Sequence, residues 1–490
     1  MTKLVPVIYI ADRICQSGYA NIIGFFFSHP LDKEQYSVII SIIGEKPGEE
    51  KADMPLFKTG SIWNNGRIGI VSTQYTHGDR TWWQAARFGM FIHWGIYSIP
   101  ARGEWMQTYE KLTAEQYAGY ADHFDPDRFE PEKWAKLAKA AGMKYVVLTA
   151  KHHDGFCMFD SAFTDFKARR DYVREIFEAF RAEGLRTGVY YSLLDWHHEQ
   201  FTVDHNHPLR DLDWAELNKT RDQHLYCEYM RNQVTELLTE YGQIDIIWFD
   251  FTYARPGGKY PEEWEAEELL KLVRKLNPSI LINGRLGLEG AGDFMTPEQY
   301  IPADGIRDKA GELLPWEGCQ TFSGAWGYHR DETTWKTPHQ LIAMLISHVA
   351  RGGNLLLNVG PDARGRFDRR AVSALEVLAR WMDEHSDAIY NCTIAPSEFP
   401  EPDNCMYTWN PATRKLYLHL MSYPVKFAFL PGLFGKVKFA RFLNDHSEVK
   451  MLPPPEKHGN MTPQVSPDTL TLQLPAIAPD VTIPVIELSL

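Results

Sequence analysis

The sequence predicts an α/β fold in which a (β/α)8 TIM-like barrel is followed by a C-terminal antiparallel β-sandwich. From about residue 80 to 385, short apolar runs alternate with segments of helical spacing, and repeated βα units imply a parallel sheet. After residue 385 the helical spacing stops, and short runs separated by Pro and Gly are typical of a sandwich. We therefore expect an N-terminal extension of unknown role at 1–75, the barrel at 76–385 and the sandwich at 386–490.

Six barrel strands are expected where the chain is apolar and rich in strand-forming residues: Phe88–His93, Tyr145–Thr149, Thr187–Leu193, Ile244–Phe249, Ile280–Ile282 and Asn354–Val359. Two weaker strands within 295–335 would complete the barrel. Helices are expected between the strands, at Trp134–Ala141, Asp171–Glu183, Thr220–Tyr241, Glu263–Leu276 and His339–Val349. Gly142, Gly184 and Gly242 each follow a helical segment, where a left-handed C-terminal cap is commonly a glycine.

The two flanking parts are expected to contain short strands. In the extension these are Val5–Ile10 and Tyr36–Ile43, followed by a charged linker. In the sandwich they are Lys415–His419, Lys426–Leu430, Lys436–Leu443, Thr469–Leu474 and Ile483–Leu490. We assign no chemistry to the extension, although an apolar segment of this kind could support a homo-oligomer.

Charge, hydropathy and cysteine usage exclude several classes of function. The net charge is −13 and no block of five or more Lys or Arg occurs, so a nucleic acid partner is not expected. The apolar run Val5–Ile10 is too short for a secretion signal and Gly24–Phe27 is too short to span a membrane, so we expect a cytoplasmic protein. The six cysteines contain no CxxC pair, although Cys392 and Cys405 could form a disulfide in an oxidising compartment.

Polar and aromatic residues follow several of the predicted strands at the point where each strand ends. In a barrel of this type the active groups lie at the carboxyl ends of the strands. Asp250 ends a largely apolar strand beside Trp248, where burial would raise the carboxyl pKa and a nearby cation would lower it. A nucleophilic carboxylate must stay ionised, so we expect a partner such as Arg285 or an imidazolium. The alternative is an aspartate that caps the following helix.

A second carboxyl group would be needed for glycoside hydrolysis, in which an acid protonates the departing oxygen. Glu317 and Glu104 are the candidates, because each lies beside a tryptophan in a predicted loop. The alternative for either residue is an ordinary surface glutamate.

Histidines near the strand ends suggest a competing hypothesis, a metal-dependent barrel hydrolase. The residues concerned are His93, His152, His153, Asp154, His197 and His198. The first strand carries no HxH pair and the sequence contains no HExxH motif, so we expect neither a metal nor any other cofactor.

Three segments resemble the α-L-fucosidases of glycoside hydrolase family 29: Phe88–Gly95 (FGMFIHWG), Lys151–Phe156 (KHHDGF) and Trp248–Asp250 (WFD). The first two are long and specific, and all three occur in the family's order. The likeness runs from about residue 80 to the C-terminus, and the first 75 residues have no counterpart.

The resemblance implies that Asp250 is the nucleophile. Glu317 matches the acid/base of one branch, although that position varies between branches. The other matching residues are expected to form the sugar pocket: His93, His152 and His153 as ligands of the fucose hydroxyls, with Glu104, Trp105, Tyr191, Trp248, Arg285 and Trp326 around them.

The expected function is therefore retaining hydrolysis of α-L-fucosides by double displacement through a covalent fucosyl-enzyme. The expected partner is a fucosylated oligosaccharide or glycoside, with no nucleic acid and no membrane. Three alternatives stay open: an α-L-galactosidase-like hexosidase, a metal-dependent barrel hydrolase and a fucose-binding protein without activity.

Overall fold

The structure is a computed structural model that describes residues 23–26, 39–42, 75–456 and 463–490. The chain divides into two compact units, 1–71 and 72–490. In the first unit β1 (Ile23–Phe26) pairs antiparallel with β2 (Ile39–Ile42). The predicted strand Tyr36–Ile43 contains β2, whereas Val5–Ile10 lies outside the described residues.

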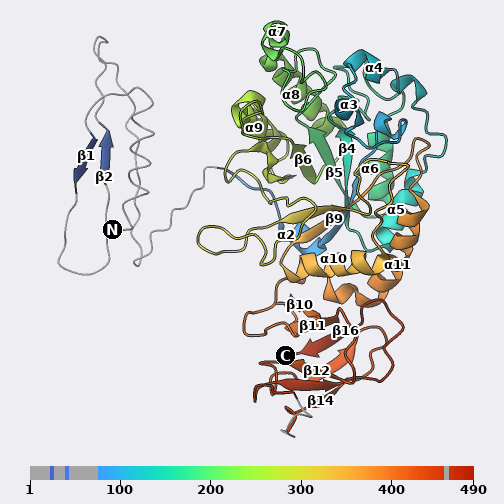
Figure 1. Cartoon of the computed structure of the whole chain (residues 1–490), viewed down its shortest axis with the longest axis vertical. Helices are drawn as coiled ribbons and strands as arrows, with labels where there is room; N and C mark the ends of the chain where they lie inside the picture. The colour runs from blue at the N-terminus through green and yellow to red at the C-terminus, as the bar shows by residue number, and fades with distance from the viewer. Residues whose placement is uncertain (1–22, 27–38, 43–74, 457–462) are drawn as a thin grey trace. The chain divides into compact units, whose positions relative to one another are not determined.

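The second unit is built around a curled, parallel, seven-stranded sheet with the order β7-β6-β5-β4-β3-β9-β8 (Figure 1). Its strands are β3 (Phe88–Ile92), β4 (Tyr145–Lys151), β5 (Arg186–Ser192), β6 (Ile246–Asp250), β7 (Leu281–Ile282), β8 (Glu317–Thr321) and β9 (Asn354–Val359). All six strongly patterned strands of the prediction are present, and β8 falls in the window where weaker strands were expected.

Residues 294–298, here called the seam, lie between the two edges of this sheet. Isolated parallel bridges join Asn283 to Phe294, Met295 to Trp316 and Glu298 to Cys319. The seam does not form a regular strand, and Pro297 within it has no N–H to donate to a ladder. It nevertheless joins β7 to β8, so the barrel is closed by eight segments of which one is irregular.

Helices cover the outside of the barrel (Figure 1). They are α2 (Thr81–Ala86), α3 (Met106–Tyr109), α4 (Ala114–Ala118), α5 (Pro131–Ala140), α6 (Tyr172–Ala182), α7 (Trp214–Leu217), α8 (Gln223–Glu240), α9 (Ala266–Leu276), α10 (Pro338–Ala350) and α11 (Arg369–His385). Local sequence explains several of their ends. Thr337 and Gln340 form a capping box at the start of α10, and Asp222 caps α8. No helix in the described ranges is long and apolar enough to cross a membrane.

The N-terminal ends of the barrel strands form a closed floor. We define the barrel floor as Tyr145, Glu317 and Asn354, which begin β4, β8 and β9, together with Trp83 of α2. All four side chains are buried, and the Asn354 amide donates to the Trp83 carbonyl at 2.8 Å. The opposite end of the barrel is open to solvent through the cavity described below.

The C-terminal part consists of two antiparallel sheets with the orders β10-β11-β16-β13 and β12-β15-β14. The strands are β10 (Cys405–Asn410), β11 (Lys415–Leu420), β12 (Phe427–Leu430), β13 (Phe439–Phe442), β14 (Lys450–Leu452), β15 (Leu470–Gln473) and β16 (Val485–Ser489). Alternation in β11 places Leu416 and Leu418 in the sandwich core while Tyr417 packs against the barrel core. All five strands predicted here are present, and β10 and β14 are additional.

The cysteines of the described residues are all buried free thiols. Cys392 and Cys405 are two of them, so the disulfide considered for an oxidising compartment does not form here.

Candidate active site

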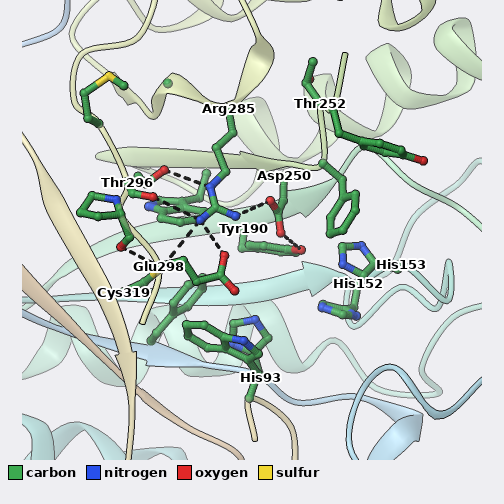
Figure 2. Close-up of a pocket in the computed structure, with 18 of the residues that line it drawn as sticks. His93, His152, His153, Tyr190, Asp250, Thr252, Arg285, Thr296, Glu298 and Cys319 are labelled. Carbon is green, nitrogen blue, oxygen red and sulfur yellow. Dashed lines mark hydrogen bonds and ion pairs between the residues drawn. The ribbon is translucent and has the colours of Figure 1, made fainter. Parts of the chain in front are cut away.

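A cavity of about 580 Å³ opens at the carboxyl ends of the barrel strands (Figure 2). It brings together most of the residues singled out in the sequence: His93, Trp105, His152, His153, Trp248, Asp250, Arg285 and Trp326 all line it. The other three, Glu104, Tyr191 and Glu317, are not among the described residues that line the cavity.

Asp250 is the last residue of β6 and lines the cavity next to Arg285 and Tyr190 (Figure 2). Its Oδ1 accepts from Arg285 Nη1 at 2.7 Å, and its Oδ2 accepts from the Tyr190 hydroxyl at 2.9 Å. Burial raises the pKa of this carboxyl, but the charge of Arg285 and the hydrogen bonds from Arg285 and Tyr190 lower it, so the net pKa lies below the usual value. Asp250 is therefore held ionised, as a nucleophile requires.

Arg285 connects Asp250 to a second carboxyl group, Glu298. One guanidinium nitrogen donates to Asp250, and the other donates to Glu298 Oε2 at 2.8 Å (Figure 2). Thr296 fixes the same guanidinium, since its hydroxyl accepts from Nε at 2.9 Å. The two carboxyl groups thus lie on either side of a single planar fork, which is a rigid way to set their separation.

Glu298 is the functional candidate that sequence reasoning missed. It lies in the seam, lines the cavity, and its side chain is 43% exposed. The sequence offers little indication of this role, because Pro297 and the irregular pairing of the seam leave no strand pattern from which to predict that residue 298 faces the site. The only available indication was that the window 295–335 should contain a strand whose end reaches the cavity.

The residue after Asp250 has a strained backbone. Phe251 has φ of +83°, in the left-handed region that a bulky side chain rarely adopts. Its ring also lines the cavity and packs against Trp105 at 5.2 Å and His153 at 4.8 Å between centroids. These aromatic contacts hold the strained conformation at the point where β6 ends, directly after Asp250.

The three cavity histidines are buried and held neutral. His93 Nδ1 contacts Asn358 Oδ1 at 2.6 Å, and His153 Nδ1 contacts the Ser192 hydroxyl at 2.7 Å. An amide oxygen can only accept, so His93 donates from Nδ1 and keeps Nε2 as an acceptor. Burial lowers the pKa of His93 to about 4 and that of His153 to about 3, and lowers the pKa of His152 as well.

We expect these histidines to make the fold sensitive to acid. Between pH 6.5 and about 4 the unfolded chain binds protons that the folded pocket rejects, so the free energy of unfolding falls as the pH is lowered. Each unit of lowered pKa corresponds to roughly 1.4 kcal/mol. His153→Asn should reduce the loss of stability between pH 7 and pH 4.5 in urea denaturation, whereas exposed His123→Asn should not. Equal losses in both variants would contradict this assignment.

The parts of the chain that the structure describes contain no set of side chains that would support a metal-dependent hydrolase. No group of three or more His, Cys, Asp or Glu side chains there is arranged to hold an ion. His197 stacks on Phe166 at 3.8 Å between ring centroids, and His198 packs against Tyr229 at 4.4 Å. Neither histidine is among the residues lining the cavity.

Glu317 lies at the other end of the barrel from the cavity mouth. It is the first residue of β8, is fully buried in the barrel floor, and accepts from Trp83 Nε1 and Trp248 Nε1, each at 3.1 Å. The structure therefore does not place it where it could reach a leaving group. The prediction took it for a loop residue, but a strand begins there and its first side chain points into the barrel.

The strand-end tyrosine that faces the site is Tyr190, and Tyr191 points outward. Successive side chains of a strand alternate between faces, so adjacent tyrosines in β5 cannot both point inward. Tyr190 donates to Asp250, whereas the Tyr191 hydroxyl donates to Gln233 of α8 at 2.7 Å. The role in the sugar pocket that was expected of Tyr191 therefore fits Tyr190 instead.

Glu104 lies behind the cavity wall. It is buried, and its Oε2 accepts from the Gly327 backbone N–H at 2.7 Å, which holds the loop that carries Trp326. Burial raises the pKa of this carboxyl. Glu104 therefore supports one aromatic wall of the cavity, while its neighbour Trp105 lines another.

Comparison with known proteins decides which family this arrangement represents. A family model described as Alpha-L-fucosidase matches residues 71–387, which is more than half of the chain. The chain belongs to the α-L-fucosidase family. Tissue alpha-L-fucosidase of Rattus norvegicus is 31% identical over 344 residues, covering 63% of this chain and 69% of the relative. Plasma alpha-L-fucosidase of Homo sapiens is 29% identical over 386 residues, covering 70% and 76%.

Solved structures of α-L-fucosidases share the fold. Alpha-L-fucosidase isoenzyme 1 from Paenibacillus thiaminolyticus aligns with a TM-score of 0.78 and 44% identity, covering 84% of this chain and 98% of that one. A family 29 α-L-fucosidase from Bacteroides thetaiotaomicron, solved as a trapped covalent intermediate with 2-fluoro-fucosyl fluoride, aligns with a TM-score of 0.70 and 25% identity, covering 83% and 94%. The covalent intermediate identifies the retaining mechanism within this family.

Proposed function

We propose that this chain hydrolyses α-L-fucosides with retention of configuration, with Asp250 as the nucleophile and Glu298 as the acid/base. One observation carries the residue assignment: a single guanidinium binds both carboxyl groups at the end of a cavity lined by neutral histidines. Retaining glycosidases need two carboxyls roughly 5–5.5 Å apart, and a shared arginine fork supports a short separation of this kind.

In the first step Asp250 attacks the anomeric carbon of the fucoside. The bond from that carbon to the leaving oxygen breaks as the bond to the carboxylate oxygen forms, and Glu298 gives its proton to the departing oxygen. The product is a fucosyl ester of Asp250. Forming the ester removes the charge of Asp250, so Arg285 is left with Glu298 as its remaining anionic partner.

In the second step Glu298, now a carboxylate, accepts a proton from a water molecule whose oxygen attacks the same carbon. The ester bond breaks and Asp250 leaves as a carboxylate, again paired with Arg285. Two displacements at one carbon return the sugar to its original configuration.

The histidines supply recognition of the sugar hydroxyls. His93 keeps Nε2 free to accept a hydrogen bond from a sugar hydroxyl, and a neutral imidazole does so without repelling the cationic Arg285. A sugar with the wrong stereochemistry would leave these buried nitrogens unpaired, which is costly. Trp248 and Trp326 line the same cavity and offer flat apolar surfaces for the sugar's methyl face.

The function is tested by measuring hydrolysis of nitrophenyl glycosides across several sugars, with product configuration followed by NMR. We expect the α-L-fucoside to be the best substrate, with the α-anomer as the first product. Faster hydrolysis of the α-L-galactoside would favour the hexosidase alternative, and a β-product would contradict retention. Tight binding of fucose without any turnover would favour a binding protein.

The cavity is larger than a single deoxyhexose needs, because volumes of roughly 300–1,000 Å³ suit drug-sized ligands. Its outer part includes Met295 and Tyr300, whose side chains are 44% and 59% exposed. Both flank Glu298 in sequence, and an acid must reach the glycosidic oxygen. The leaving group therefore extends toward Met295 and Tyr300.

Tyr300→Ala is expected to lower kcat/KM for fucosylated oligosaccharides by roughly three- to tenfold, through loss of aromatic contact with the leaving sugar. Hydrolysis of α-fucosyl fluoride should change little, because fluoride is too small to reach the ring. Phe434→Ala, which alters an exposed aromatic residue of the C-terminal part outside the cavity lining, is the matched control. Equal losses on both substrates would place Tyr300 in the fucose site instead.

We further propose a cytoplasmic location, supported by the free thiols of all described cysteines. Self-association remains a prediction from the extension.

A further inference from the structure

Glu317 is a buried carboxyl group held only by neutral donors. Trp83 and Trp248 each donate an indole N–H, and the Tyr145 hydroxyl makes a third, short hydrogen bond. None of these contacts within the described residues comes from a cation, and burial raises the pKa of the carboxyl. Such a group is costly to bury, and an amide or an apolar side chain would fill the space at lower cost.

One of the three donors also belongs to the active site. Trp248 connects the barrel floor to the cavity. Its indole N–H donates to Glu317 in the floor, and its ring lines the cavity. The Arg285 guanidinium lies over that ring, 4.7 Å from its centroid. Arg285 in turn binds Asp250 and Glu298.

We propose that Glu317 is a positioning residue for the reaction: by holding the Trp248 indole, it fixes the surface on which Arg285 rests and so keeps Arg285 aligned with both catalytic carboxyls. The cation–π contact is sensitive to ring orientation, and Glu317 determines that orientation from below. This inference rests on the proposed function, since it assigns Asp250 and Glu298 to catalysis.

The ionisation of Asp250 should report the alignment of Arg285. The charged and titratable groups that face Asp250 or its arginine come from every side of the cavity: His93 after β3, His153 after β4, Tyr190 of β5, Arg285 after β7, Glu298 of the seam and Cys319 of β8. Arg285 is the first of these in lowering the Asp250 pKa. Glu317 does not touch Asp250, so its effect must pass through Trp248 and Arg285.

The test is Glu317→Gln, which keeps the size of the side chain but cannot accept all three donors. We expect kcat/KM for nitrophenyl α-L-fucoside to fall by roughly ten- to a hundredfold, as misplacement of catalytic groups does. The acidic limb of its pH profile should move upward by roughly one unit, because Asp250 loses part of its cationic partner. The wild-type protein, measured alongside, tests the proposed function independently.

Trp83→Phe is the matched control. It removes another hydrogen bond to the same carboxyl, but Trp83 does not line the cavity and does not contact Arg285. We expect lower stability with an unchanged acidic limb. If Glu317→Gln likewise lowers stability and leaves the acidic limb of the pH profile unchanged, Glu317 contributes to stability alone and the proposal is overturned.

If Glu317→Gln does not fold, the proposal can be tested on the wild-type protein. The proposal requires the Trp248 indole proton to be held by Glu317, so its exchange with solvent should be far slower than that of an exposed indole. Rapid exchange of this proton in the NMR spectrum would overturn the proposal. A wild-type protein without fucosidase activity would instead overturn the proposed function.

Discussion

Asp250→Gly is expected to reduce turnover of α-L-fucosides by about 10⁴- to 10⁶-fold, as removal of a catalytic nucleophile does in other enzymes. No other described carboxylate is paired with both Arg285 and Tyr190 in the cavity, so no neighbour can take over the attack. The rate is best measured with an activated aryl fucoside, for which the first step does not depend on acid assistance.

Azide provides the decisive control for this variant. A small anion can enter the space left by the carboxylate and attack from the same face, so it should restore activity and yield β-fucosyl azide by a single inversion. Asp250→Asn keeps partners for Arg285 and Tyr190, and should fold and remain inactive. Turnover near the wild-type level in either variant would exclude Asp250 as the nucleophile.

Glu298→Ala is expected to affect substrates according to their leaving groups. For fucosylated oligosaccharides, whose leaving oxygen needs a proton, kcat/KM should fall by about 10²- to 10⁴-fold. For fucosyl fluoride or a dinitrophenyl fucoside the fall should be small, because these groups depart without a proton. Plotting kcat/KM against leaving-group pKa gives the measurement, and the variant should show the steeper dependence.

The stereochemistry with azide separates the two carboxyl roles. In Glu298→Ala the fucosyl ester still forms on Asp250, so azide should attack the ester and give α-fucosyl azide, opposite to the product of Asp250→Gly. A uniform loss across all leaving groups would return the acid/base role to another carboxyl. Glu317 would then have to reach the cavity from the barrel floor, which its three hydrogen bonds oppose.

Much of the fold followed from sequence periodicity. The strongest strands are buried on both faces and so appear as continuous runs rich in apolar residues, such as the predicted Tyr145–Thr149, which the structure confirms within β4. β14 was not predicted, since three residues with little burial carry no usable pattern. The seam was not located beyond the window 295–335 given for two weaker strands, because its hydrogen bonds are isolated bridges and its sequence contains a proline.

The site was predictable where a motif ends a regular strand, and less so elsewhere. Asp250 and the cavity histidines follow strands whose bounds the sequence defines well. Choosing between Tyr190 and Tyr191 required knowing which face of β5 points inward, and adjacent tyrosines give no alternation from which to judge. The prediction of Glu317 and Glu104 rests on their neighbouring tryptophans and does not include Glu298, whereas proximity to Asp250 depends on position along the barrel axis, which the sequence does not give.

The irregular pairing of the seam affects where the barrel can tolerate insertions and deletions. The acid/base candidate lies on the one closing segment whose attachment depends on scattered bridges, while Asp250 lies on a strand paired along its length on one side. Residues could be inserted or removed beside the seam without shifting the register of the paired strands. Engineering of linkage preference is therefore best begun by exchanging the loop that follows the seam, while Thr296 and Glu298 are kept.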